Sequence, residues 1–231
     1  RVIFPIRNQR WDFIALAWRV LGNGMPKYLN SSSSNIYDKS SILYWLFQAR
    51  NEITKKDFII ITEWYMDCIS LHQAGFTNTV CVSWTALTEK HIWIIKKLTS
   101  KIYLCFDWDW AWLNATNLSI EMLKNKDVEV KIINLWNYKD PDEVIKAWMD
   151  FNDYINNAVS PIWFYLNTLE NTDSLQDKKQ HLNKLLDIVK NYQDNVERDY
   201  YLKEISQKLD IKLEVVYGEF SKTRLAKREE N

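Results

Sequence analysis

Five carboxylates stand where apolar, strand-like runs of this sequence end. Glu63 follows DFIIIT, Asp107 and Asp109 follow KIYLCF, and Asp140 and Asp142 lie in the turn after the last such run. The four Asp form two Asp-x-Asp pairs, whose members lie on one side of an extended segment. A single Asp of this kind is more often an ordinary loop residue, but a cluster of uncompensated carboxylates is unfavourable without a cation among them. Their hard oxygens suit Mg²⁺ or Mn²⁺, and such sites usually carry phosphoryl chemistry.

The segments that position these carboxylates alternate between strand-like and helix-like patterns. Four apolar runs, DFIIIT, NTVCVS, KIYLCF and VEVKIINL, are separated by helical stretches over Tyr65–Ala74, 89–98 and Ala111–Lys124. This alternation predicts β-α-β units and a mostly parallel sheet flanked by helices. Active sites in such sheets lie at the carboxyl ends of the strands, where Glu63 and Asp107 stand.

The regions on either side differ from this α/β segment. Residues 1–50 mix strand signals with turns and carry seven basic residues against two acidic ones, a net charge of +5. Such an excess is typical of either a solvated surface or a phosphate-binding face. Residues beyond 142 contain no strand-like run, and their charged helical stretches predict a small helical bundle. The helices are expected over 143–157, 161–169, 174–192, 195–208 and 211–225, which gives a division into residues 1–55, 56–142 and 143–231.

Composition excludes several classes of protein. The chain has 231 residues, of which 47% are hydrophobic and 26% charged, so it is neither disordered nor fibrous. A net charge of zero excludes a uniformly basic coat. Three Cys without a C-x-x-C pair argue against a zinc ribbon and a disulfide framework. Neither a membrane span nor a signal peptide is recognisable, which predicts a cytoplasmic protein.

Tryptophan and glycine occur in abnormal proportions. The sequence has 12 Trp and 4 Gly, whereas about 7% Gly is usual. Many Trp stand at short polar junctions, as in FDWDWAW at 106–112 and TEWYMD at 62–67, where a chain usually needs the freedom of Gly. Some bacterial lineages read the codon UGA as Gly, and translating such a gene with a table that reads UGA as Trp gives this pattern. We therefore expect Gly at most of these positions in the natural protein.

With Trp read as Gly, the two motifs become TEGYMD and FDGDGAG and resemble the Toprim motifs of primases, topoisomerases and some nucleases. Further motifs, in their order and spacing, are similar to the bacterial replicative DNA primases of the DnaG type. They are RVIFPIRNQR at 1–10, AWRVLGNGMPKYLNS at 17–31, LYWLFQA at 43–49, VSWTALTEKHI at 82–92 and KDPDEVI at 139–145. The resemblance covers about residues 1–165. It implies a Toprim-type sheet preceded by part of a mixed α+β subdomain and followed by a small helical bundle.

The resemblance also implies roles for particular residues. Glu63, Asp107 and Asp109 would be catalytic and metal-binding, and Asp140 and Asp142 would complete the metal contacts. Behind these ligands, Asp67 would support the site. In the basic segment, four residues match the nucleotide- and template-binding patch of the family: Arg19, Lys27, Tyr28 and Asn30.

The implied activity is the synthesis of short RNA primers on single-stranded DNA from NTPs, by nucleotidyl transfer with two Mg²⁺ or Mn²⁺ ions. Zinc is expected only in an N-terminal domain outside this chain. Contact with the replicative helicase is expected through a C-terminal domain beyond residue 231. The chain as printed is expected to be inactive, because indoles crowd the carboxylates and the polymerase core is incomplete.

Two other functions stay open at this point. One is another Toprim enzyme, a topoisomerase or nuclease fragment, against which RVIFPI and KYLNS argue. The other is a Trp-rich module that stacks single-stranded nucleic acid, which requires real and exposed Trp. Only a primase consumes NTPs on a template.

Overall fold

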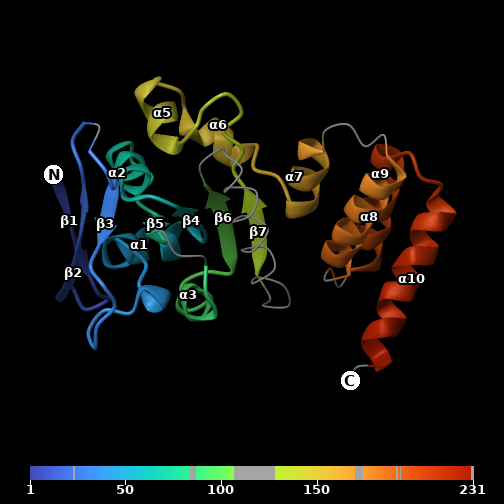
Figure 1. The fold of residues 1–231 in the computed structure, drawn as a ribbon, viewed down its shortest axis with the longest axis horizontal. Coiled ribbons are helices and arrows are strands. Elements are labelled where there is room, and N and C mark those ends of the chain that lie inside the picture. Colours follow the sequence, from blue (N-terminus) through green and yellow to red (C-terminus); the bar gives the residue numbers. More distant parts are fainter. Residues whose placement is uncertain are drawn as a thin grey trace. The chain divides into compact units, whose positions relative to one another are not determined.

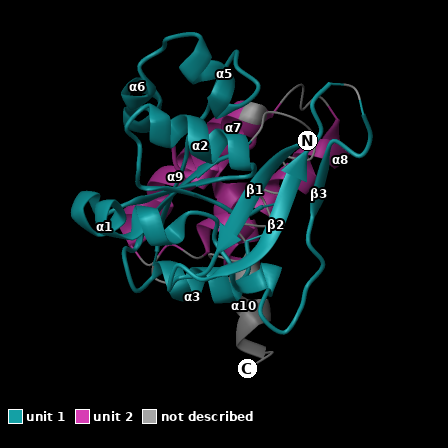
Figure 2. Ribbon diagram, turned by 90° about the vertical axis from the view of Figure 1, so that its left-hand side faces the viewer, with its two compact units in different colours: residues 1–158 teal, residues 159–231 magenta. Residues whose placement is uncertain are grey.

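The structure is a computed structural model that describes residues 1–22, 24–83, 87–106, 128–169, 174–190, 192 and 194–229. The chain divides into two compact units, residues 1–158 and 159–231, which Figure 2 shows in different colours. Each unit has its own buried core. No described helix has both the length and the apolar character that crossing a membrane requires.

Unit 1 begins with an antiparallel sheet, ordered β1-β2-β3 (Figure 1). Its strands are β1 (Val2–Arg7), β2 (Phe13–Arg19) and β3 (Tyr28–Asn30). Alternate residues of β1 and β2 are buried, among them Phe4, Ile6, Ala15 and Ala17, so one face of this sheet packs on the core. After β3 come a short 3-10 turn, η1 (Lys39–Ser41), and helix α1 (Leu46–Lys56).

The second sheet of unit 1 is parallel and confirms the predicted β-α-β pattern. Its order is β5-β4-β6-β7, and β4 lies between β5 and β6. Ile59, Ile60 and Ile61 of β4 are fully buried, as expected for a central parallel strand. The strands are β4 (Ile59–Thr62), β5 (Thr79–Cys81), β6 (Lys101–Cys105) and β7 (Glu129–Ile132), with helices α2 (Tyr65–Gln73) and α3 (Glu89–Ile95) between them.

Helix α2 belongs to the cores of both sheets. Tyr65 and Cys68 pack with Phe4 of the antiparallel sheet. Leu71, two turns along the same helix, packs with Ile60 of the parallel sheet. Helices α5 (Pro141–Lys146) and α6 (Phe151–Asn156) complete this second core after β7. Because α2 begins two residues after Glu63, the packing that joins the two sheets also places this carboxylate.

Unit 2 is entirely helical in its described part. Its helices are α7 (Pro161–Thr168), α8 (Leu175–Val189), α9 (Asn195–Leu209) and α10 (Leu213–Glu229). The predicted apolar stripe of α8 is confirmed: Leu182, Leu185, Leu186 and Val189 are all buried against α9 and α10.

Tryptophan occupies backbone conformations that ordinarily favour glycine. Seven described residues other than Gly have positive φ, and four of them are Trp: Trp11 (73°), Trp45 (63°), Trp136 (54°) and Trp148 (58°). This left-handed region crowds the Cβ of any L residue and is a marked exception for a bulky one. Trp148 also separates α5 from α6, so the single helix expected over 143–157 is wrong.

The left-handed backbone at Trp148 gives a stability prediction of unusual sign. The side chain is 95% exposed, so Trp148→Gly removes strain and little packing, and we expect the free energy of unfolding to rise by about 1 kcal/mol. Trp93 is also exposed but lies within α3, and Gly is a poor helix former. Trp93→Gly should therefore lower the free energy of unfolding by about 0.5 kcal/mol. Urea unfolding of the two variants checks the opposite signs, and a loss of stability in Trp148→Gly would contradict the strain.

Candidate active site and nucleic-acid face

Glu63 directly follows β4 at the carboxyl edge of the parallel sheet. In the register of the two central strands, Thr62 pairs with Cys105. The chain therefore leaves β4 and β6 side by side, with Glu63 and Phe106 as the next residues. Phe106 is buried and is the last residue described before residue 128. Asp107 and Asp109 lie outside the described residues.

Beneath Glu63, a buried cysteine holds the backbone. The Cys81 thiol, at the end of the neighbouring strand β5, donates to the Glu63 carbonyl with an S···O distance of 3.1 Å. The Ser83 N–H donates to the same sulfur at 3.1 Å. Burial raises the pKa of Cys81, and the charges of Asp67 and Glu63 raise it further, so the thiol keeps the proton that it donates. No spacing in the sequence indicated this contact.

Asp67 lies in the first turn of α2 and is 3% exposed. It is thus buried beside the backbone that follows β4, and its charge raises the pKa of Cys81. Glu63 therefore stands among residues at the carboxyl ends of β4 and β5, Cys81 and Asp67 among them.

Asp140 and Asp142 lie at the start of α5, and both have partners within the protein. Asp140 is the N-cap residue, since its Oδ1 accepts the Glu143 N–H at 2.8 Å. Asp142 Oδ1 accepts the Ser70 hydroxyl of α2 at 2.5 Å, and its other oxygen forms an ion pair with Lys146. The Ser70 contact joins α5 to the helix that begins after Glu63.

The electrostatics of Lys146 link α5 to the antiparallel sheet. The hydrogen bond to Asp142 raises the pKa of Lys146, and the charge of Asp140 adds to this effect, while the charge of Arg19 lowers it. Arg19, the last residue of β2, is therefore close enough to Lys146 of α5 for the two charges to repel each other. This is the point where the basic N-terminal segment meets the acidic one.

The four residues predicted to bind nucleotide or template lie close together, at the end of β2 and in or directly before β3. Arg19 pairs with Tyr28, and its guanidinium lies 5.3 Å from the centre of the Tyr28 ring; the Lys27 ammonium lies at 6.0 Å. Asn30 accepts the Tyr65 hydroxyl of α2 at 2.9 Å. The Tyr28 ring is only 6% exposed and stacks on the indole of Trp64, with 4.7 Å between ring centres. In this chain Tyr28 therefore packs rather than offering an open ring face.

A cavity of about 570 Å³ opens beside these residues. Arg19, Lys27 and the loop containing Gly22 and Gly24 line it, and Met66 of α2 closes one side. It combines cationic side chains with an apolar wall, which suits a phosphate-bearing group with an aromatic base.

The described residues do not assemble a metal centre by themselves. They include no group of three or more His, Cys, Asp or Glu side chains placed to hold an ion. Asp140 and Asp142 are engaged as a helix cap and as a partner of Ser70 and Lys146. A metal site on this edge would depend on Glu63 together with Asp107 and Asp109.

Three family models match successive parts of the chain. Residues 1–50 match the DNA primase catalytic core, N-terminal domain; residues 60–145 match a Toprim-like domain; and residues 165–214 match the DnaB-helicase binding domain of primase. We expected the helicase-binding region beyond residue 231, and the third match corrects this, because the matched residues lie in the helical unit of the chain itself.

Known proteins agree with these matches. A DNA primase of Clostridium acetobutylicum is 37% identical over 222 residues, which are 94% of this chain and 37% of the Clostridium protein. The crystal structure of a DNA primase domain from Pseudomonas aeruginosa is 30% identical, with a TM-score of 0.75, and the match covers 94% of this chain and 71% of that one. A DnaG primase catalytic domain bound to ssDNA is 26% identical with a TM-score of 0.74, over 90% of this chain and 69% of that one.

The antiparallel sheet, the four-stranded parallel sheet and the strand-end carboxylate define a Toprim-type α/β core. The family models and the similar proteins define a narrower class of protein. This chain belongs to the bacterial DNA primase family of the DnaG type. It spans 37% of the length of the Clostridium primase.

The two contacts of Asp142 should differ in strength. Ser70 is buried, so Ser70→Ala leaves a carboxylate without its hydroxyl donor, and we expect the free energy of unfolding to fall by about 2 kcal/mol. Lys146 has a side chain that is 71% exposed, so Lys146→Ala should cost about 0.5 kcal/mol or less. Urea unfolding measures both, and equal losses would contradict the ranking.

Proposed function

We propose that this chain carries the RNA polymerase core function of primases, the template-directed joining of NTPs into short primers on single-stranded DNA during replication. The observation that carries the proposal is the meeting of two charged regions within unit 1. The strand-end carboxylate Glu63 and the α5 carboxylates lie on one side, and Arg19 and Lys27 lie on the other. α2 contacts both. Nucleotidyl transfer needs this pairing of an acidic site with a phosphate-binding face.

On the acidic side we assign Glu63, Asp107 and Asp109 to catalysis and to binding of Mg²⁺ or Mn²⁺, with Asp140 and Asp142 as further contacts. The chemistry of the donors supports this, because hard carboxylate oxygens suit these ions. When bound, such ions lower the pKa of an attacking hydroxyl and neutralise a triphosphate. The hydrogen bond from the Cys81 thiol to the Glu63 carbonyl and the buried Asp67 then keep the Glu63 carboxylate in place.

On the basic side, Arg19 and Lys27 neutralise phosphates. Asn30 accepts a hydrogen bond from the Tyr65 hydroxyl, and this contact fixes the position of β3. Support for a single-stranded DNA template comes from the related primase domain whose structure holds ssDNA. Tyr28 becomes a stacking surface only when Trp64 does not cover its ring.

We propose further that most Trp of this chain stand where the natural protein has Gly. The left-handed backbone at Trp11, Trp45, Trp136 and Trp148 supports this, because those conformations are unstrained only for Gly. Trp64 supports it in another way, since its indole covers Tyr28. UGA codons read as Trp would account for all of these positions.

A replicative helicase is the proposed protein partner. Its binding region is assigned to the helical unit, because residues 165–214 match the model named for helicase binding. The helicase contact is therefore proposed within the chain and not beyond residue 231. For the rest of the chain we propose a basic N-terminal part over 1–55 and a Toprim part over 56–142.

Metal binding should depend on the identity of the residues between the carboxylates. We expect the triple variant Trp108→Gly, Trp110→Gly and Trp112→Gly to bind Mn²⁺, and the chain as printed to bind it at least about tenfold more weakly, because a bulky residue next to each carboxylate in the sequence leaves less room for a hydrated ion than Gly does. Isothermal calorimetry makes the comparison. Adding Asp107→Asn to the triple variant is the control and should remove binding, whereas micromolar Mn²⁺ affinity in the chain as printed would overturn the prediction.

Primer synthesis is the direct test of the function. The full-length product of the gene, with Gly at the Trp positions that UGA encodes, should join labelled NTPs into primers on a single-stranded template in the presence of Mg²⁺. Glu63→Gln should lower the rate of primer synthesis by at least about a hundredfold. Even the loss of a residue that only hydrogen-bonds to a metal ligand typically costs about 10- to 100-fold in metal affinity or activity.

Glu129→Gln is the matched control for this substitution. It removes an exposed carboxylate at the start of β7, the opposite end of the strand from the site edge, and should leave the rate unchanged. Template cleavage without consumption of NTPs would contradict the proposal and favour a Toprim nuclease.

A further inference from the structure

Lys146 is the last residue of α5, and its charge lies next to a carboxylate at the start of that helix. The ammonium forms an ion pair with Asp142 Oδ2, one helical turn earlier. Long side chains on a helix lean toward its N-terminus, so residues four positions apart meet in this way. The Lys146 side chain is 71% exposed, whereas that of Asp142 is 16% exposed. Asp142 accepts one of the three N–H groups of an ammonium that faces solvent.

The carboxylate beneath Lys146 is fixed from α2. The hydroxyl of Ser70, a buried residue of that helix, donates to Asp142 Oδ1 at 2.5 Å. One oxygen of Asp142 therefore contacts the buried helix and the other contacts the exposed ammonium. Figures 1 and 2 both show α5 beside α2. The position of the Lys146 ammonium is thus defined relative to the helix that begins after Glu63.

The same face of α2 leads to the cavity beside the basic strands. Met66 closes one side of that cavity, which Arg19 also lines. Met66 and Ser70 are four positions apart, so they lie on one face of the helix and about 6 Å apart along its axis. The hydrogen bond to Asp142 raises the pKa of Lys146, and the charge of Arg19 opposes this rise, as a nearby cation does. Lys146 therefore brings a further positive charge close to the cavity, from the acidic side.

We infer that Lys146 binds the triphosphate of the incoming NTP, contacting its oxygens from the acidic side while Arg19 contacts them from the basic side. This inference rests on the proposed function. Two cations that repel each other are both stabilised by an anion placed between them. A triphosphate carries more negative charge than a single phosphate of a template strand, so it gains more from the pair. The ammonium can leave Asp142 for a phosphate, because an exposed ion pair is weak.

Nucleotide affinity without turnover is the first measurement. Isothermal calorimetry titrates ATP or AMP, with Mg²⁺ and without template, into the full-length product of the gene with Gly at the Trp positions that UGA encodes. Lys146→Met should weaken ATP binding about fivefold, because it removes a charged hydrogen bond that is partly open to water. The affinity for AMP, which lacks the two outer phosphates, should stay within about twofold. Lys146→Arg retains a cation with N–H donors and should stay within about twofold of the unsubstituted protein for ATP.

Primer synthesis at saturating Mg²⁺ gives a second readout. Lys146→Met should raise KM for NTPs about fivefold and leave kcat within about twofold, the pattern of a lost binding contact. Lys55→Met is the matched control and should leave both unchanged. Lys55 also forms an exposed ion pair within a helix, with Glu52, and its side chain is 76% exposed. It precedes β4 and so lies at the opposite end of that strand from Glu63.

Unchanged ATP affinity in Lys146→Met would overturn the inference, and so would equal losses for ATP and AMP. Fluorescence anisotropy of a labelled oligodeoxythymidylate separates the two sources of phosphate: its affinity should be the same in Lys146→Met, and a loss there would assign the ammonium to the template instead. A raised Mg²⁺ requirement with unchanged KM for NTPs would show that Lys146 acts only through Asp142. By contrast, an unsubstituted protein that makes no primers would contradict the proposed function itself.

Discussion

Helix α2 is the constraint on which the arrangement of unit 1 depends. Its first residue, Tyr65, is buried between the two sheets: the ring stacks on Phe4 of β1 with 5.1 Å between centres, and Tyr44 meets it edge-on at 4.7 Å. The Tyr65 hydroxyl donates to Asn30 of β3. Aromatic pairs of this kind add to the free energy that burial provides. One helix end thus holds the antiparallel sheet in place while its other turns pack on the parallel sheet.

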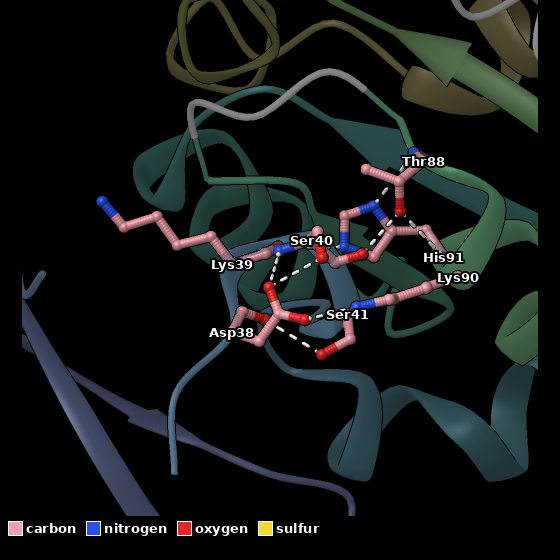
Figure 3. A network of polar contacts seen from close by, with 7 residues as sticks. All are labelled: Asp38, Lys39, Ser40, Ser41, Thr88, Lys90 and His91. Carbon is pink, nitrogen blue, oxygen red and sulfur yellow. Dashed lines mark hydrogen bonds and ion pairs between the residues drawn. The ribbon is translucent and has the colours of Figure 1, made fainter. Parts of the chain in front are cut away.

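Residues proposed for the site are connected to both ends of this helix. Glu63 lies two residues before it, and Cys81 fixes the backbone there from the neighbouring strand. Ser70, further along α2, holds Asp142 of α5. The hydrogen bonds of Thr88 and His91 to the backbone carbonyls of Ser40 and Lys39 add a second connection between the basic N-terminal segment and the Toprim part (Figure 3). The residues proposed for catalysis and those proposed for substrate binding therefore share one set of packing contacts.

Much of the fold could be predicted because its signals are local. Apolar runs with helical stretches between them predicted β4 to β7 with α2 and α3, and heptad-like spacing predicted the buried face of α8. The contacts that hold the carboxylates could not be predicted, since Ser70 and Asp142 are 72 positions apart and nothing in their spacing indicates a pair. The single helix expected over 143–157 was wrong because Trp148 gave no sign of a left-handed turn. A Gly there would have indicated it.

At Trp148 the residue type and the backbone conformation disagree. A bulky, almost fully exposed indole at a left-handed residue satisfies neither packing nor local conformation, and Trp11, Trp45 and Trp136 share its left-handed backbone. Local and global preferences usually agree in natural proteins. The central claim is therefore that a primase core of this fold has Gly where these Trp are printed. Reading the DNA codons at the twelve Trp positions tests it most directly. We predict UGA at most of them, in a genome whose other Trp codons are UGG; UGG at Trp11, Trp45, Trp136 and Trp148 would contradict the claim.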